Sequence, residues 1–309
     1  MLRPRLVLGF LIVSALAVLC WFDAHAIRPG IYLAPLALVL ALLAAQEILA
    51  FLRLGGHQPL GWVVILGALV PVLASCGPIA WESYPAHCPV GRLGWLAVGL
   101  VCALLIALVA EMGRFDGPGS ATVHLALACL PILYVGGLLG MFVQLRLLGN
   151  GLGENPDQTG GRYGLIAWLS LVIVAKSSDI GQYTVGRLWG RHQLAKTLSP
   201  GKTWEGALGG IGFALLGGGL SLGPLAGALG CPSGRGWPAW LGGCLCYALL
   251  VGIAGIVGDL AESMLKRDVG VKDSSHWLPG FGGVLDLLDS LLVAAPVAYV
   301  LWLTGLVGP

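Results

Sequence analysis

The sequence has few charged side chains, and this scarcity excludes an ordinary soluble globular protein. Asp, Glu, Lys and Arg make up 10% of the 309 residues, whereas 57% are hydrophobic and the mean hydropathy is +0.87. Soluble domains carry about 25% charged residues. The net charge of +2 is also too small to indicate a nucleic-acid-binding protein. The 49 glycines fit a membrane protein, because Gly is more frequent in transmembrane helices than in soluble ones.

The eight cysteines lack the spacing of a structural zinc site. No CxxC pair is matched by a second pair or by a His pair, so we expect no bound zinc. Cys244 and Cys246 fall within an apolar run and are predicted to be small packing residues. Cys76 and Cys88 lie close together in the chain. The sequence leaves open whether they form a disulfide.

Long apolar runs dominate the chain, and a helix needs about 20 apolar residues to cross the hydrocarbon core of a bilayer. The nine runs of this kind lie at about residues 6–22, 31–52, 62–76, 95–112, 121–148, 164–182, 206–223, 240–260 and 286–305. We therefore predict an all-α fold, a polytopic transmembrane helical protein with about nine spans.

The first apolar run also resembles a signal peptide. Arg3 and Arg5 precede it, and Ala24-His25-Ala26 follows it like a cleavage site. We expect a transmembrane helix instead, because the apolar stretch is long and a further span follows at once. Whether this segment is cleaved stays open.

The basic residues of the loops predict the orientation. With a cytoplasmic N-terminus, eleven of the 17 Lys and Arg residues lie on the cytoplasmic side, five lie on the opposite side and Lys176 lies within a span. Cytoplasmic loops of membrane proteins carry such an excess. The polar clusters gather in the second half of the chain. We therefore expect residues 1–160 to be a transmembrane scaffold and residues 161–309 a catalytic transmembrane half, within one integrated membrane domain.

A polar stripe closes the eighth predicted span. The residues at helical positions i, i+3, i+4 and i+7, which share one face, are Asp259, Glu262, Ser263 and Lys266. Carboxylates at this depth are costly and usually face a cavity, a partner or an ion. The simpler alternative is an interfacial salt bridge with Lys266 or Arg267.

A glycine-rich turn and two more carboxylates follow. Residues 279–283 read Pro-Gly-Phe-Gly-Gly and lead into the last predicted span. Free N–H groups at a helix N-terminus favour anions such as phosphate. Asp286 and Asp289 lie at i and i+3, and a divalent cation such as Mg²⁺ would relieve their repulsion. Acidic residues favoured by the helix dipole are the alternative.

A basic loop joins the sixth and seventh predicted spans. Lys176, Asp179 and Tyr183 share a face where the sixth span ends. The cations of the loop suit a nucleoside triphosphate, with Lys202 as a mobile point charge. Thr203 is equally suited to cap the seventh helix, and topology alone also requires a basic cytoplasmic loop.

The order and spacing of these clusters are more specific than any one of them. Residues 263–267 (Ser-Met-Leu-Lys-Arg), 272–273 (Lys-Asp) and 279–283 precede Asp286 and Asp289. Upstream, Asp179, Tyr183 and Gly186 precede residues 199–206 (Ser-Pro-Gly-Lys-Thr-Trp-Glu-Gly). Together, over about residues 175–295, they resemble the signature of the phosphatidate cytidylyltransferase (CDP-diacylglycerol synthase) family.

The resemblance implies transfer of CMP from CTP to phosphatidate, giving CDP-diacylglycerol and pyrophosphate for phospholipid synthesis. It implies Mg²⁺ as the cofactor, with a second cation left open, and Asp259, Asp286 and Asp289 as its ligands. The implied catalytic residues are Asp259, Asp286, Asp289, Lys202 and Lys266. The implied substrate-binding residues are Asp179, Ser199, Lys202, Lys266, Arg267, Lys272, Gly282 and Gly283.

The partners implied in the same way are CTP, phosphatidate and bilayer lipid, without nucleic acid; a homodimer is left open. The implied location is a bacterial inner membrane with the site facing the cytoplasm. Two positions depart from the family pattern, which has His in place of Phe281 and Arg in place of Leu287. His276 is either a spatial substitute or an ordinary loop histidine.

Three other functions stay open at this point. A CTP-dependent prenol-type kinase would share the nucleotide site but need a base for its alcohol acceptor. A degenerate, non-catalytic family member is suggested by Phe281 and Leu287. A transporter would spread charges over several spans near the bilayer midplane. Here the charges gather at the helix ends of one half.

Overall fold

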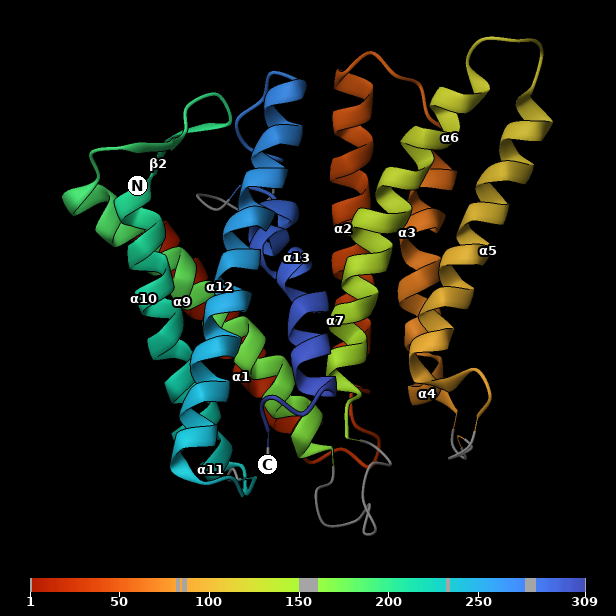
Figure 1. Cartoon of the computed structure of the whole chain (residues 1–309). Helices are drawn as coiled ribbons and strands as arrows, with labels where there is room; N and C mark the ends of the chain where they lie inside the picture. The colour runs from red at the N-terminus through yellow and green to blue at the C-terminus, as the bar shows by residue number, and fades with distance from the viewer. Residues whose placement is uncertain are drawn as a thin grey trace. The chain divides into compact units, whose positions relative to one another are not determined.

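The computed structural model describes residues 2–81, 84, 88–149, 161–231, 234–275 and 282–308, and the described chain is almost entirely helical (Figure 1). The helices of the first half are α1 (Leu2–Ala24), α2 (Leu33–Leu54), α3 (Gly61–Ser75), α4 (Gly77–Ala80), α5 (Gly91–Arg114), α6 (Ala121–Leu130), the π-helical turn η1 (Pro131–Gly137) and α7 (Leu138–Arg146). Those of the second half are α9 (Arg162–Trp189), α10 (Trp204–Leu220), the π-helical turn η2 (Ser221–Leu225), α11 (Ala226–Ala228), α12 (Trp237–Asp268) and α13 (Val284–Leu303).

The all-α prediction is confirmed, and the span count is close to the expected nine. Among the described residues, eight helical segments are long and apolar enough to cross a membrane. The predicted run at 62–76 forms α3, which has only 15 residues and contains Pro71. The first apolar run lies within α1, and its residues Val7–Ala24 are one of the eight candidate spans.

The run at 121–148 forms one helical segment with a local irregularity. α6 passes into α7 through η1, which begins at Pro131. Proline lacks the N–H that an α-helix needs at that position, and such a loss favours a π-helical bulge. The segment Ala121–Arg146 nevertheless remains a candidate span of 26 residues.

The helices pack into two compact units. Unit 1 comprises Met1–Gln144 and Asp268–Leu287, and unit 2 comprises Leu145–Arg267 and Leu288–Pro309. In unit 1, α3 packs against α5, and Gly99 of α5 lies directly on the backbone of α3 at Pro71. Buried small and β-branched side chains, such as Val63, Ala103 and Ala107, fill this region. Cys76 and Cys88, in the same unit, are free thiols.

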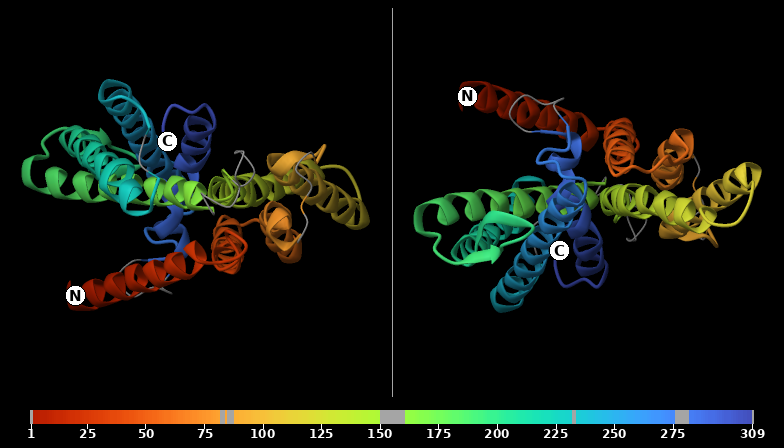
Figure 2. Two further views of the ribbon diagram at one scale, coloured as in Figure 1. Left: turned by 90° about the horizontal axis from the view of Figure 1, so that it is seen from below. Right: turned by 90° about the horizontal axis from the view of Figure 1, so that it is seen from above.

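Unit 2 is built on the close packing of α9 against α10, which lie side by side in both views of Figure 2. A row of glycines permits this approach: a side chain at Gly181 would overlap the carbonyl of Gly209, and one at Gly206 would press on Gln182. Small residues bring helix backbones together in this way in membranes.

A short antiparallel hairpin, β1 (Gln193–Ala195) and β2 (Ser199–Thr203), joins these two helices. Thr203 caps α10, because its Oγ1 accepts a hydrogen bond from the backbone N–H of Gly206 at 3.1 Å. Thr203 therefore has the helix-capping role that the sequence analysis gave as an alternative. This cap fixes where Lys202, the preceding residue, leaves the hairpin.

Candidate active site

Three carboxylates converge inside unit 2. Asp259 and Glu262 lie one turn apart on α12, and Asp289 lies on α13. One oxygen from each lies within 4.8 Å of the others. The close packing depends on Gly258, since a side chain there would overlap the carbonyl oxygen of Asp289. Glu262 and Asp289 are buried, and Asp259 is half-buried.

Lysine ammonium groups face this cluster. Lys202 Nζ lies 2.6 Å from Asp259 Oδ2, and Lys266 Nζ lies 2.6 Å from Glu262 Oε2. Lys266 and Glu262, two residues of the polar stripe predicted at the end of the eighth span, form the salt bridge that the sequence analysis gave as the simpler alternative. The same geometry keeps one cation beside the half-buried Asp259 and another beside the buried Glu262, so positive and negative charges are concentrated in the cluster.

Asp179 is joined to the cluster through Lys176. The Lys176 ammonium donates to Asp179 Oδ2 at 2.9 Å and to Ser290 Oγ at 3.0 Å, and it lies 3.9 Å from Asp289 Oδ1. Ser290 Oγ also lies 3.0 Å from Asp179 Oδ2. Within the described chain, Asp179 Oδ1 is buried without a hydrogen-bond partner. A buried carboxylate oxygen of this kind can accept a ligand proton or contact a cation.

The donor set fits a hard divalent cation. Mg²⁺ takes oxygen ligands at about 2.0–2.1 Å, so two opposite ligands lie about 4.1 Å apart. The oxygens of Asp259, Glu262 and Asp289 are within 4.8 Å of one another and need only a small inward movement. Lys202 and Lys266 neutralise part of the charge of these carboxylates, and a divalent cation would neutralise more of it. Glu262 is on the predicted stripe but not in the predicted metal set, and it takes part in this group.

A cavity of about 450 Å³ opens beside these residues. It is lined by Asp179, Gln182, Tyr183, Gly186, Arg187, Gly201, Lys202, Thr203, Gly206, Ala207 and Asp259. Small-molecule sites commonly occupy about 300–1,000 Å³. The C-terminal end of α9, the hairpin and the start of α10 therefore form a ligand-sized pocket with an anionic and a cationic part.

The hairpin beside this pocket is held by further contacts. Arg267 Nε donates to the carbonyl of Leu198 at 3.3 Å, next to Ser199 in β2. Glu205 of α10 accepts hydrogen bonds from the backbone N–H groups of Arg191 and His192. Ser199 is half-buried, and Lys196 at the hairpin turn is exposed.

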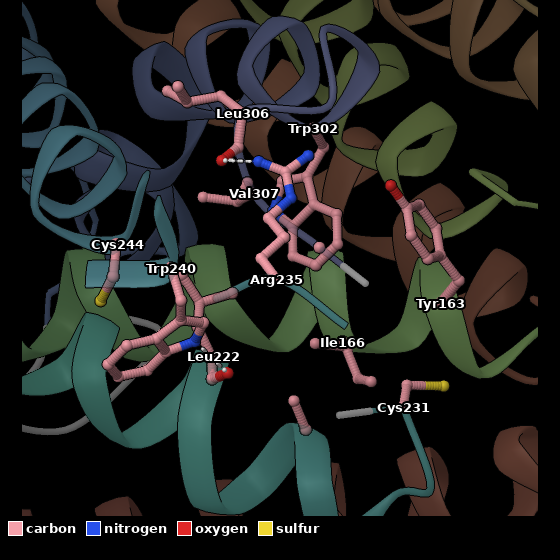
Figure 3. A pocket seen from close by; sticks show the side chains of 12 residues that line it. Tyr163, Ile166, Leu222, Cys231, Arg235, Trp240, Cys244, Trp302, Leu306 and Val307 are labelled. Carbon is pink, nitrogen blue, oxygen red and sulfur yellow. Dashed lines mark hydrogen bonds between the residues drawn. The ribbon is translucent and has the colours of Figure 1, made fainter. Parts of the chain in front are cut away.

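Another cavity of unit 2 lies near the opposite end of α9 and is much smaller (Figure 3). It has about 20 Å³, which is room for about one water molecule. Tyr163, Trp240 and Trp302 line it, and Arg235 donates to the carbonyl of Leu306 at 3.0 Å. This cavity is too small for a nucleotide.

The remaining predicted site residues belong to unit 1. Asp286 Oδ2 accepts hydrogen bonds from the N–H of Ser274 at 3.0 Å, from Ser274 Oγ at 2.8 Å and from the N–H of Gly283 at 2.7 Å. Lys272 is exposed. Gly282 has φ of +89°, a conformation that favours glycine. His276 and Phe281 lie outside the described residues.

The N-terminus of α13 has an anionic partner that is not among the predicted site residues. Glu47 of α2 accepts the N–H groups of Val284 and Leu285, both at 2.8 Å. The donors predicted to be free for phosphate therefore bind the protein's own carboxylates. The sequence contained one signal for Glu47, since it is the only charged residue in the run at 31–52, and such a residue is a functional candidate.

Comparison with known proteins identifies the family of the chain. Residues 5–304 match the model of the cytidylyltransferase family. The phosphatidate cytidylyltransferase of Brucella suis is 33% identical over 258 residues, which cover 84% of this chain and 76% of that protein. The phosphatidate cytidylyltransferase of Pseudomonas aeruginosa is 44% identical over 138 residues, covering 44% of this chain and 48% of the relative. The enzyme of the same name from Synechocystis is 42% identical over 137 residues, covering 44% and 43%. The chain belongs to the cytidylyltransferase family, and it is a nucleotidyltransferase integrated in the membrane.

Proposed function

We propose that the protein transfers CMP from CTP to phosphatidate, giving CDP-diacylglycerol and pyrophosphate. The observation that carries this proposal is the cluster of Asp259, Glu262 and Asp289 beside Lys202, at the edge of a nucleotide-sized cavity. The names of the relatives support the same substrates. The acyl chains of phosphatidate would remain in the bilayer. The lipid substrate therefore explains why an enzyme that uses a soluble nucleotide is embedded in the membrane.

The chemistry requires little proton transfer. A phosphate oxygen of phosphatidate attacks the α-phosphorus of CTP and forms a new P–O bond. The bond from that phosphorus to the oxygen bridging the β-phosphate breaks, and pyrophosphate leaves with the electron pair. Because phosphatidate is already anionic, no strong base is needed. Positioning of two polyanions and neutralisation of the leaving group account for most of the catalysis.

Asp259 and Asp289 are the proposed ligands of Mg²⁺. The candidates for a third ligand are Glu262, whose carboxylate lies in the cluster, and Asp286, which the sequence analysis named. A bound divalent cation supplies charge stabilisation to phosphoryl oxygens. Comparing Glu262→Gln with Asp286→Asn in a Mn²⁺-binding titration would assign the third ligand.

The cationic residues divide between the two substrates in this proposal. Lys202, near Ser199, neutralises the triphosphate, and Lys266 stabilises the charge that develops during transfer. Arg267 and Lys272 hold phosphatidate or the leaving pyrophosphate. Asp179 completes the nucleotide or metal site through its buried Oδ1. Gly282 and Gly283, directly before α13, take part in substrate binding together with Lys272.

We further propose that residues 1–160 act as a scaffold and residues 161–309 as the catalytic half, with the site facing the cytoplasm of a bacterial inner membrane. The basic residues of the hairpin support this orientation. Lys196→Cys should therefore add a maleimide-reactive thiol that an impermeant reagent reaches only after the cells are opened, compared with the parent chain. Labelling of intact spheroplasts from outside would contradict the orientation.

The function is tested with purified protein in vesicles containing phosphatidate. We expect CDP-diacylglycerol to form only when CTP and Mg²⁺ are both present and to disappear with EDTA. Vesicles with a prenol in place of phosphatidate should give no phosphorylated product. Prenol phosphate without CDP-diacylglycerol would identify a kinase, and no product from either acceptor would indicate a non-catalytic member.

A further inference from the structure

The Glu47 carboxylate binds two stretches of the chain, residues 274–275 and residues 284–285. In the first stretch, Ser274 Oγ donates to Oε2 and Ser275 Oγ donates to Oε1, both at 2.8 Å. In the second stretch, the N–H of Val284 donates to Oε1 and the N–H of Leu285 donates to Oε2, again at 2.8 Å. Each oxygen therefore binds one hydroxyl and one backbone donor.

The same contacts connect Glu47 to Asp286. Ser274 Oγ lies 2.8 Å from Glu47 Oε2 and 2.8 Å from Asp286 Oδ2. A hydroxyl has one proton, so it donates to one carboxylate at a time. The N–H of Ser274 holds Asp286 independently at 3.0 Å. Glu47, Ser274 and Asp286 thus form one network around the start of α13.

This network has no room for a side chain at Gly283. A Cβ at that position would overlap Ser274 Oγ and both carboxylate oxygens of Glu47. Glu47 is only 6% exposed, and an unpaired carboxylate at that burial would be strongly destabilising. Three donors, the Ser274 hydroxyl that Glu47 shares with Asp286, and the positive end of the α13 dipole compensate for its desolvation.

We infer that Glu47 is a positioning residue of the transfer reaction. It is the resident anion of the α13 N-terminus, and it fixes residues 274 and 275, close in the chain to Lys272, and residues 284 and 285, directly before Asp286. It also fixes the first turn of the helix that carries Asp289. This inference rests on the proposed function for its catalytic part. It also means that the helix N-terminus holds a carboxylate of the protein and not the phosphate of a substrate.

The substitution Glu47→Gln tests this role with little change in size. The amide oxygen of Gln can still accept one hydroxyl and one N–H. The amide nitrogen can donate to the second hydroxyl, but it cannot accept the remaining N–H of Val284 or Leu285. One buried backbone donor therefore loses its acceptor, and the helix end loses its negative charge.

We expect faster hydrogen exchange at residues 284 and 285, measured on a peptide spanning residues 282–287, and a fall of about 10-fold in kcat/KM for CMP transfer, which is the lower end of the effect of outer-shell partners. Glu111→Gln is the matched control. Glu111 is also buried in a helix of unit 1, but its partner is His124, at 2.7 Å. The control should leave the exchange of residues 282–287 unchanged and kcat/KM within about two-fold.

The two readouts separate the possible failures. Unchanged exchange in Glu47→Gln would overturn the structural role. Faster exchange with kcat/KM within two-fold of the parent chain would overturn the positioning role and leave a purely structural residue. If the parent chain itself forms no CDP-diacylglycerol, the proposed function fails, and the exchange rates still decide whether Glu47 holds residues 284 and 285.

Discussion

Replacing Asp289 by Asn should lower CDP-diacylglycerol formation by about 100- to 1,000-fold, the loss typical of removing one preorganised electrostatic group from an active site. Asp289 is 8% exposed and is the contribution of α13 to the three-carboxylate cluster. Asn has nearly the same shape but no negative charge. The cluster then retains two carboxylates opposite the ammonium groups of Lys202, Lys266 and Lys176.

The measurement is kcat at several Mg²⁺ concentrations, because a weakened metal site is partly restored by more Mg²⁺. Asp116→Asn is the control, since Asp116 is an exposed residue of unit 1, and its activity should stay within about two-fold. Undiminished activity in Asp289→Asn would remove Asp289 from the metal site.

Replacing Lys202 by Ala should lower kcat/KM for CTP by about 100-fold, because close charge pairs at binding sites contribute several kcal/mol. The Lys202 side chain is 16% exposed and lies 2.6 Å from Asp259 Oδ2. It leaves β2 immediately before the Thr203 cap, so its position is set by the hairpin and by α10.

The matched control for Lys202 is Lys196→Ala in the same hairpin. Lys196 is exposed at the turn, and we expect a change of less than about two-fold. Initial rates at varied CTP give kcat/KM for both variants. Equal losses in the two variants would show that the net charge of the loop matters and that the position of Lys202 does not.

The sequence predicted the helical architecture well because its signals are local. A run of apolar residues specifies a span, and the spacing of Asp259, Glu262 and Lys266 specifies one helix face. The short α3 was less clear, since its 15 residues and Pro71 fall between a span and a connecting helix. The cap formed by Thr203 could also be predicted from the sequence, because it depends only on two residues that are three positions apart.

The assembly of the site was less predictable because it depends on contacts far apart in the chain. Ser274 and Glu47 are separated by 227 positions. Helical spacing correctly placed Asp286 and Asp289 on one face of the last helix. It did not show that Asp286 accepts three hydrogen bonds from Ser274 and Gly283, or that Glu262 joins the cluster. Those assignments required side-chain positions.

The most direct test of the central claim follows two labels of CTP into the lipid. The purified protein is incubated in phosphatidate vesicles with Mg²⁺ and with CTP labelled at either the α- or the γ-phosphate. Transfer of CMP predicts that the α-label enters the lipid and that the γ-label leaves as pyrophosphate. Entry of the γ-label into the lipid, with the α-label left in CDP, would contradict the account.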